Sequence, residues 1–279
     1  IEMFTDPNNI IILDTTLRDG ELMPGVRFDL QQKLKIAISL EMLGVDIIEV
    51  GYPGKYEKDF RDTLEISRVI HHTTVCGLAR CQSSEIEKVL GALEPASQGR
   101  IHLYSNVRTL SKASEQEVFT EIAQSIKFAR TYCDNIQWSA FDATRSDRDF
   151  LCQAIAVALD NGAKTIGIPD SLGVALPEQF GELIQVIYDR VSHLDRAILS
   201  VHCHDDRAMA VENAIAAMDS GARQIECTID GLGARKGNSD LAKIVYAIID
   251  RTGYKTSIQT NCLSQVSELV RHTIEVNKP

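Results

Sequence analysis

Short aliphatic runs alternate with longer stretches of mixed polarity along the whole chain. An unbroken apolar run of about four to eight residues is typical of a strand buried on both faces, whereas a helix repeats its apolar residues every three or four positions. Runs of the first kind predict strands at 10–13, 46–51, 74–79, 100–104, 135–140, 165–168, 197–203 and 224–229. The stretches between and after them predict helices at 31–43, 58–70, 84–93, from about 114 onward, 148–161, 177–191, 208–220 and 239–250.

Two helices carry further local signals. The helix at 31–43 has apolar residues at Leu34, Ile38 and Met42, and Gly44 marks its end because glycine most easily takes the left-handed conformation beyond a helix. The fourth helix is expected to begin near Ser114, where a capping hydroxyl is followed three residues later by the carboxylate of Glu117.

Eight alternations of strand and helix predict an α/β protein, a (β/α)8 or TIM barrel, because parallel units joined by right-handed crossovers can close on themselves. A doubly wound sheet would instead carry a glycine-rich turn after its first strand, and the segment 15–20 is not such a turn. We therefore expect one barrel domain over 1–255, followed at 256–279 by the start of an accessory helical segment. Its apolar side chains would pack on the barrel or on a partner; they are Leu263, Val266, Leu269 and Val270.

The most informative polar pair is His202 with His204, at the end of the seventh predicted strand. Successive side chains of a strand point to opposite faces, so these two imidazoles point the same way while Cys203 points away. Either histidine alone would be read as a strand end with ordinary hydrogen bonds. Together, at the end of a strand that bears the functional face of a barrel, they favour half of a metal site.

Almost every predicted strand ends in a group that can bind a metal, an anion or a proton. In chain order these groups are Arg18 with Asp19, Glu49, Arg80, His102, Ser139 with Asp142, Asp170 with Ser171, His202 with His204, and Asp230 with the loop to Asn238. In a barrel the carboxyl ends of all strands meet at one mouth.

Barrel closure would bring Asp19 beside the seventh and eighth strand ends. With His202, His204 and the amide oxygen of Asn238 it would form a mixed nitrogen and oxygen shell with open positions, which is typical of a catalytic metal. The ligand types leave zinc, magnesium and manganese as alternatives. Arg18 beside this set could hold a carboxylate or stabilise a developing oxyanion, although a structural salt bridge is the alternative.

The loop after the eighth strand is rich in glycine and basic residues. Gly231, Gly233 and Gly237 allow close approach of a ligand, and Arg235 with Lys236 suits a phosphorylated one. By itself this loop is a weak indication of cofactor binding.

Composition narrows the class of protein. A formal net charge of −10 without a basic run argues against nucleic-acid binding. The sequence contains no apolar run near the roughly 18 residues of a membrane span and no secretory signal at its start. Seven scattered cysteines suit a reducing cytosol, so a cytoplasmic location is expected.

Four segments together resemble the alpha-isopropylmalate synthase and homocitrate synthase family, the barrel enzymes that share an Asp-Arg-Glu motif and depend on a metal. The similarity extends over about residues 10–249, and we expect it to represent the catalytic barrel and not the C-terminal regulatory domain of the leucine-inhibited synthases. The matching segments are Asp14-Thr15-Thr16-Leu17-Arg18-Asp19-Gly20-Glu21, Ser200-Val201-His202-Cys203-His204-Asp205-Asp206, Gly221-Ala222-Arg223-Gln224-Ile225-Glu226, and Gly231-Leu232-Gly233 through Gly237-Asn238.

The resemblance implies a Claisen-type condensation of acetyl-CoA with a 2-oxo acid, as in leucine biosynthesis, by an acyltransferase that is a homodimer. It assigns a divalent metal to Asp19, His202, His204 and Asn238, and stabilisation of the transition state to Arg18. The keto acid would meet further strand-end residues: Glu49, Arg80, His102, Ser139 and Ser171. The loop with Gly231, Gly233, Arg235 and Gly237 would approach coenzyme A.

Three positions depart from the family pattern. Leu22 stands where isopropylmalate synthases usually have Gln, Phe141 stands where they have a pocket Glu, and Ala234 replaces the Glu of the glycine loop. Asp142 is no automatic substitute for a carboxylate at 141, because adjacent strand residues face opposite ways. The more apolar mouth implies a bulkier or aromatic 2-oxo acid, as in benzylmalate-forming relatives.

Two alternatives remain at this point. The same residues could cleave a carbon–carbon bond as related lyases do, although the sequence lacks a cysteine-bearing glycine loop of the hydroxymethylglutaryl-CoA lyase kind. A non-catalytic descendant is the other alternative, and retention of the complete metal set argues against it.

Overall fold

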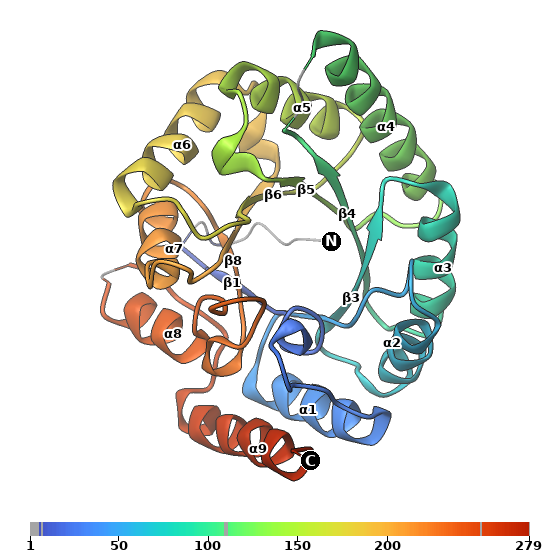
Figure 1. The fold of residues 1–279 in the computed structure, drawn as a ribbon, viewed down its shortest axis with the longest axis vertical. Helices are drawn as coiled ribbons and strands as arrows, with labels where there is room; N and C mark the ends of the chain where they lie inside the picture. The colour runs from blue at the N-terminus through green and yellow to red at the C-terminus, as the bar shows by residue number, and fades with distance from the viewer. Residues whose placement is uncertain (1–5, 7, 109–110, 252, 279) are drawn as a thin grey trace.

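Eight parallel strands close into a barrel in chain order, as predicted, with β1 paired to β8. Figure 1 shows this computed structural model down the barrel, and it describes residues 6, 8–108, 111–251 and 253–278. The strands are β1 (Ile11–Asp14), β2 (Ile47–Glu49), β3 (Thr74–Arg80), β4 (Gly99–Asn106), β5 (Ile136–Phe141), β6 (Thr165–Asp170), β7 (Ile198–Cys203) and β8 (Gln224–Cys227).

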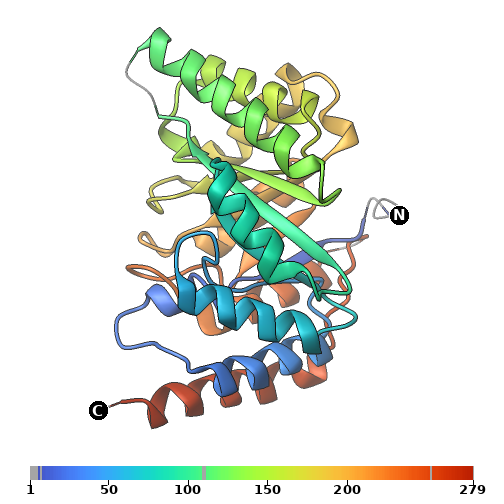
Figure 2. The same ribbon diagram turned by 90° about the vertical axis from the view of Figure 1, so that its right-hand side faces the viewer.

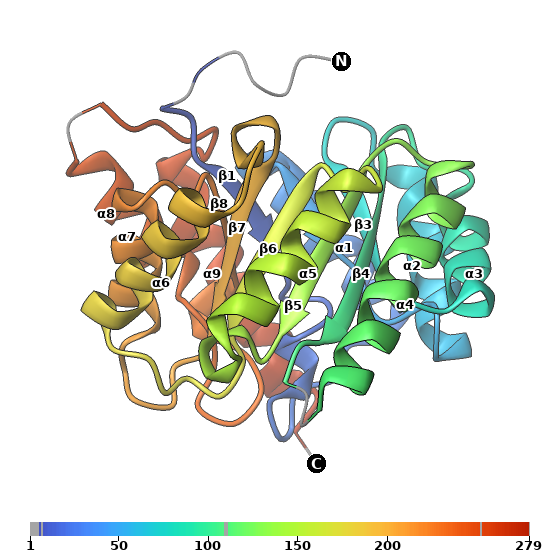
Figure 3. The same ribbon diagram turned by 90° about the horizontal axis from the view of Figure 1, so that it is seen from above.

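Helices cover the outside of the barrel, one after each strand (Figure 3). They are α1 (Leu30–Leu43), α2 (Glu57–Val69), α3 (Ser83–Leu93), α4 (Lys112–Arg130), α5 (Arg148–Asp160), α6 (Pro177–Arg190), α7 (Ala210–Asp219), α8 (Leu241–Ile249) and the additional α9 (Leu263–Val276). Outward-facing aliphatic residues of the strands pack against the helices in one continuous core. No helix in the described part of the chain is long and apolar enough to cross a membrane.

The inside of the barrel changes from apolar to polar along the strands. Near the amino ends an apolar plug contains Ile11, Leu13, Ile47, Cys76 and Ile198. Toward the carboxyl ends the inward positions carry buried glutamate, glutamine and histidine side chains, and Arg100 already lies level with Cys76 of the plug. Because side chains alternate between the two faces of a strand, these polar groups all point into the barrel.

Helix α1 ends as expected, and only some of its apolar residues face the barrel. Gly44 caps it with φ 91°, the left-handed conformation that glycine permits. Ile38 and Met42 are exposed, and Ile36 and Leu40 are buried instead. The face that meets the barrel repeats every three or four residues through Ile36, Leu40 and Leu43, and Leu34 is partly buried beside it.

The start of α4 also differs from the prediction. Ser111 is its N-cap, and the Ser111 side chain accepts a hydrogen bond from the backbone N–H of Ser114. Ser114 therefore lies within the first turn and is not the capping residue.

Helix α9 packs beside α1 on the outside of the barrel (Figures 1 and 2). Leu263, Val266 and Val270 are buried there, so of the two expected surfaces the apolar stripe contacts the barrel. Asp230, in the loop after β8, also accepts hydrogen bonds from Ser267 and Arg271 of α9. Pro279, the last residue of the predicted tail, lies outside the described residues, and the boundary between 255 and 256 remains a prediction.

The loop between β1 and α1 is fixed by a buried lysine. Lys33 on α1 is inaccessible to solvent and forms ion pairs with Glu21 at 2.6 Å and with Asp62 at 3.1 Å. Its ammonium also donates to the carbonyl of Leu17. These contacts hold the segment that carries Arg18 and Asp19 over the mouth of the barrel.

Candidate active site at the barrel mouth

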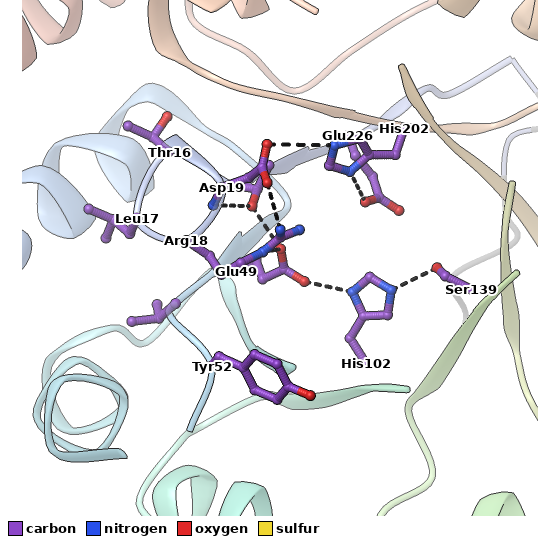
Figure 4. Close-up of polar contacts among 12 residues, drawn as sticks. Thr16, Leu17, Arg18, Asp19, Glu49, Tyr52, His102, Ser139, His202 and Glu226 are labelled. Carbon is purple, nitrogen blue, oxygen red and sulfur yellow. Dashed lines mark hydrogen bonds and ion pairs between the residues drawn. The ribbon is translucent and has the colours of Figure 1, made fainter. Parts of the chain in front are cut away.

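His202 is held on both sides of its ring. Its Nδ1 is 2.9 Å from Oε2 of Glu226 (Figure 4), and its Nε2 is 2.9 Å from Oδ1 of Asn238. The register of β7 and β8 places His202 directly beside Glu226, which explains the first contact. A carboxylate on one imidazole nitrogen fixes the ring so that the other nitrogen faces the mouth.

Asp19, His202 and His204 bring one ligand atom each within 4.8 Å of one another. Asn238 connects this group, because its Nδ2 donates to Oδ2 of Asp19 at 2.5 Å. Nδ1 of His204 is buried and has no hydrogen-bond partner among the described residues. A buried nitrogen without a partner is costly unless something else binds it, so this donor set fits a divalent metal.

The ionisation of these groups supports the same conclusion. Burial, and then the charge of His202, lower the pKa of His204 to about 4, so its ring is neutral and offers a lone pair at neutral pH. Burial alone would raise the pKa of Glu226, but the hydrogen bond and charge of His202 outweigh it and lower that pKa to about 2. Glu226 is therefore a fixed negative charge behind His202.

Arg18 lies between two carboxylates. Its Nε donates to Glu49 at 2.7 Å, and its Nη1 donates to Asp19 at 2.9 Å. Among the residues that the structure describes, Nη2 has no protein partner, and the side chain keeps 16% exposure. The guanidinium is thus anchored on one side and open to the mouth on the other.

A second chain of hydrogen bonds extends across the barrel from Glu49 (Figure 4). Oε1 of Glu49 is 2.6 Å from Nδ1 of His102, and Nε2 of His102 is 2.7 Å from Oγ of Ser139. The other Glu49 oxygen accepts from Thr15 and Arg18. Both oxygens are occupied and the residue is fully buried, so Glu49 orients its neighbours instead of presenting a free carboxylate.

Glu49, Cys76 and His102 are another group with ligand atoms within 4.8 Å. His102 and Glu49 already satisfy each other here, and burial raises the pKa of the Cys76 thiol, which disfavours the thiolate that a metal needs. This group fits a metal less well than the first.

A buried polar layer supports both chains from below. Gln137 donates to Glu226 at 2.7 Å, and Ser200 donates to the same carboxylate at 2.8 Å. Arg100 donates to Gln137 and Gln224, and no carboxylate in the described part of the chain lies at hydrogen-bond distance from it. Such a network holds the side chains above it in one arrangement.

Gly233 is required by the close approach of its loop to the site. A Cβ at this position would lie 2.2 Å from Nδ2 of Asn238 and 3.0 Å from Oδ2 of Asp19. Gly231 and Gly237 have positive φ, as does Arg235. The predicted glycine loop thus packs against the candidate metal ligands.

Other predicted residues are engaged outside this cluster. Arg235 forms a two-pronged ion pair with Asp206 and also donates to the carbonyl of Ser171. Oγ of Ser171 accepts from the backbone of Asp142. The Arg80 guanidinium pairs with Glu85 and is about half exposed at the rim. The structure therefore brings together Arg18, Asp19, Glu49, His102, Ser139, His202, His204 and Asn238, and leaves Arg80, Ser171 and Arg235 with other partners.

Phe141 faces the mouth and Asp142 does not. Phe141 lies on the same strand face as Ser139 and is 45% exposed, whereas Asp142 is buried and paired with Arg145. This agrees with the expectation that Asp142 is no automatic substitute for a carboxylate at 141. Leu22, the other apolar departure, is also exposed.

Sequence reasoning missed Glu226 as a member of the site. It lies one residue before the end of β8, and attention to residues at strand ends passed over it. The available signal was the pair Gln224 and Glu226, two polar residues spaced by two in an otherwise apolar strand.

A family model described as HMGL-like matches residues 9–270. The chain is 40% identical over 270 residues to a 2-isopropylmalate synthase of Nitrosomonas europaea, with 94% of this chain and 53% of that protein covered. A 2-isopropylmalate synthase of Rhodopirellula baltica is 41% identical over 276 residues, with 96% and 52% covered. The resemblance inferred from the motifs is thus confirmed, and the chain spans about half the length of the curated relatives it matches.

Solved structures share the fold. An HMG-CoA lyase of Acinetobacter baumannii, in complex with coenzyme A and 3-methylmalate, aligns with a TM-score of 0.80 at 18% identity, covering 99% of this chain and 93% of that one. A Bacillus subtilis HMG-CoA lyase aligns with a TM-score of 0.77 at 17% identity, covering 97% and 95%. At these identities the likeness concerns the barrel alone.

Proposed function

Because the chain belongs to the HMGL-like family, we propose that it is an acyltransferase that condenses acetyl-CoA with a 2-oxo acid to give a 2-substituted malate. The observation that carries this proposal is the convergence of Asp19, His202 and His204 beside the open side of Arg18. The synthase names of relatives at about 40% identity support it. The fold shared with lyases does not by itself favour the lyase alternative.

The acetyl methyl group loses a proton, and its carbon forms a bond to the keto carbon of the 2-oxo acid. The keto oxygen gains a proton and becomes a hydroxyl. Water then cleaves the thioester C–S bond, which leaves a 2-hydroxy dicarboxylic acid and free coenzyme A. One water molecule is consumed for each product.

Asp19, His202 and His204 would hold a divalent metal, zinc, magnesium or manganese, with the Asn238 amide oxygen beside them. The unpartnered Nδ1 of His204 is the observation that this assignment explains. When bound, the metal would supply Lewis-acid polarisation of the keto group and a template for it. Glu226 keeps the His202 ring oriented for this task.

Arg18 would stabilise negative charge on the reacting oxygens. Glu49 and Asp19 hold two of its nitrogens and orient Nη2 toward the mouth, so little reorganisation is needed when the charge develops. Burial opposes the charged form of Arg18, but Glu49 and Asp19 outweigh it and raise its pKa further, so the guanidinium stays charged.

Ser139 would deliver a proton to the new hydroxyl oxygen. Its Oγ is 2.7 Å from His102, which is in turn held by Glu49 at 2.6 Å. A hydroxyl backed by an imidazole and a carboxylate can pass on a proton and recover it. Gly167 leaves the space beside Ser139 free, because a Cβ there would lie 1.9 Å from the Ser139 oxygen.

The remaining assignments follow the resemblance. Ser171 and Arg80 at the rim would contact the keto acid, and the loop of Gly231, Gly233, Arg235 and Gly237 would contact acetyl-CoA. Arg235 would have to exchange its ion pair with Asp206 for a phosphate to do so. A homodimer in the cytoplasm completes the proposal.

Release of free thiol tests the function directly. The protein is incubated with a divalent metal, acetyl-CoA and a panel of 2-oxo acids, and thiol is followed over time. We expect release that a chelator abolishes and that zinc, magnesium or manganese restores. Arg18→Gln should lower the rate by about 100-fold, since it removes one preorganised stabiliser.

Arg251→Gln is the matched control, because Arg251 pairs with Asp219 on the surface. Its rate should equal that of the unaltered protein. Absence of thiol release with every acid would overturn the proposed function.

A further inference from the structure

One side of the mouth is lined by aromatic rings. The Phe141 ring lies 6.3 Å from that of Tyr104, which lies 6.2 Å from that of Tyr52. The hydroxyls of the two tyrosines are 3.1 Å apart, and Tyr52 also donates to Glu85. These contacts fix the tyrosines, while Phe141 at the end of the row remains 45% exposed.

The row stands directly beside the proton-bearing residues. Tyr104 is the register partner of Ser139, and Phe141 lies two residues further along β5 on the same face. Two residues of a strand span about 6.6 Å, roughly the spacing at which aromatic rings interact. A ring attached through one methylene to a keto group at Ser139 would therefore reach Phe141.

The surroundings of the row favour an uncharged group. The nearby cations have carboxylate partners, Arg80 with Glu85 and Arg145 with Asp142. Leu78, beside His102 in the register of β3 and β4, adds an apolar side chain to the same face. An aromatic group placed there would contact rings and aliphatic carbon, and it would not bury an unpaired charged side chain.

We propose that the 2-oxo acid accepted by this site carries an aromatic side chain, and that Phe141 determines this preference by contacting it. The inference rests on the proposed function and specifies its substrate class. The 2-oxo acid group would lie near Arg18 and Ser139, with its ring packed on Phe141 at the outer end of the row.

Phenylpyruvate and 3-methyl-2-oxobutanoate are the probes that separate the two classes of acid. With metal and acetyl-CoA present, kcat/KM measured by thiol release should be at least about tenfold higher for phenylpyruvate. Phe141→Ala should remove that preference by lowering kcat/KM for phenylpyruvate roughly tenfold, with little effect on the aliphatic acid. Phe141→Leu, which keeps apolar volume without a ring, should fall between the two.

Tyr246→Ala is the control, since Tyr246 is a similarly exposed ring on α8 in the outer layer. It should leave both values unchanged. Equal or better use of 3-methyl-2-oxobutanoate would overturn the inference while leaving the proposed function intact. A rise in the KM for acetyl-CoA in Phe141→Ala with every acid would assign the ring to the thioester and would also overturn it.

Binding measured by calorimetry keeps the inference testable if no thiol is released. In the presence of the metal, phenylpyruvate should bind about tenfold more tightly than the aliphatic acid, and Phe141→Ala should abolish the difference. Equal affinities would overturn the inference, whereas the absence of turnover alone would overturn only the proposed function.

Discussion

At the scale of single residues, the candidate site depends on carboxylates that orient other side chains through hydrogen bonds. His202 faces Asp19 and Asn238 only because Glu226 fixes its opposite nitrogen, and Glu226 in turn accepts from Ser200 and Gln137. Arg18 is aimed in the same manner by Glu49 and Asp19. The chemistry of the mouth is therefore prepared by carboxylates that need not touch a substrate.

Glu226→Gln tests this dependence. The amide keeps the shape of the side chain but removes the charge that supports His202, so affinity for zinc or manganese should fall about 10- to 100-fold. Competition with a chelator of known affinity measures it. Glu182→Gln, at a surface ion pair with Arg148, serves as control. An unchanged affinity in Glu226→Gln would show that the ring is held by other means.

The sequence predicted the residues that face one another at the mouth, but not those behind them. Asp19, His202 and Asn238 could be placed because strand ends of a barrel converge whatever the details of packing. The supporting roles of Glu226 and Arg100 could not be predicted, since these roles depend on which residues meet across the barrel interior. That is set by strand register, and the sequence of one strand does not contain the register of the next.

At the scale of elements, strands were predicted more reliably than the faces of helices. A buried parallel strand is recognised by a run of apolar residues without any alternation, because both of its faces are buried. An example is β7 with Ile198, Leu199 and Val201. Helix α1 has apolar residues on several sides, and its buried face was decided by what it meets, including the docking of α9. The buried Lys33 shows the same effect, because its partners Glu21 and Asp62 lie on other elements.

Substitution of two valines of α9 tests how strongly this helix is packed against the rest of the protein. Val270 is fully buried against the barrel, whereas Val276 in the same helix is 63% exposed. Val270→Ala should lower the free energy of unfolding by about 2 kcal/mol through lost burial and an added cavity. Val276→Ala should change it by less than about 0.5 kcal/mol. Urea denaturation measures both, and equal effects would mean that α9 is not docked in solution.

At the scale of the whole molecule, the packing of the barrel buries carboxyl groups away from water. Asp14 is completely buried on the outer side of β1, where Thr16 is the one described residue that donates hydrogen bonds to its oxygens. Burial raises the pKa of Asp14 to about 7 although the hydrogen bonds from Thr16 oppose the rise. In the unfolded chain this carboxyl has its ordinary pKa, so folding takes up a proton at mildly acid pH.

This uptake gives stability a definite dependence on pH. The contribution of Asp14 is fully present below pH 3.8, its ordinary pKa, and is lost as the pH rises through about 7. The stability of the unaltered protein relative to Asp14→Asn should therefore decrease between these values, by at most about 1.4 kcal/mol per pH unit. Urea unfolding of both proteins across that range measures the difference, in which the other titrating groups cancel. A difference that does not change with pH would place the Asp14 carboxyl in contact with water.

The hydrogen bond between Asp19 and Asn238 has a consequence for synthesis of the chain. These residues are 219 positions apart, and they meet only where β1 joins β8, at the seam of the barrel. The ribosome synthesises Asp19 long before Asn238. An incomplete nascent chain that ends before Asn238 therefore lacks part of the ligand set. An ion that binds there would select chains whose seam has closed, and would draw the folding equilibrium toward the finished ring.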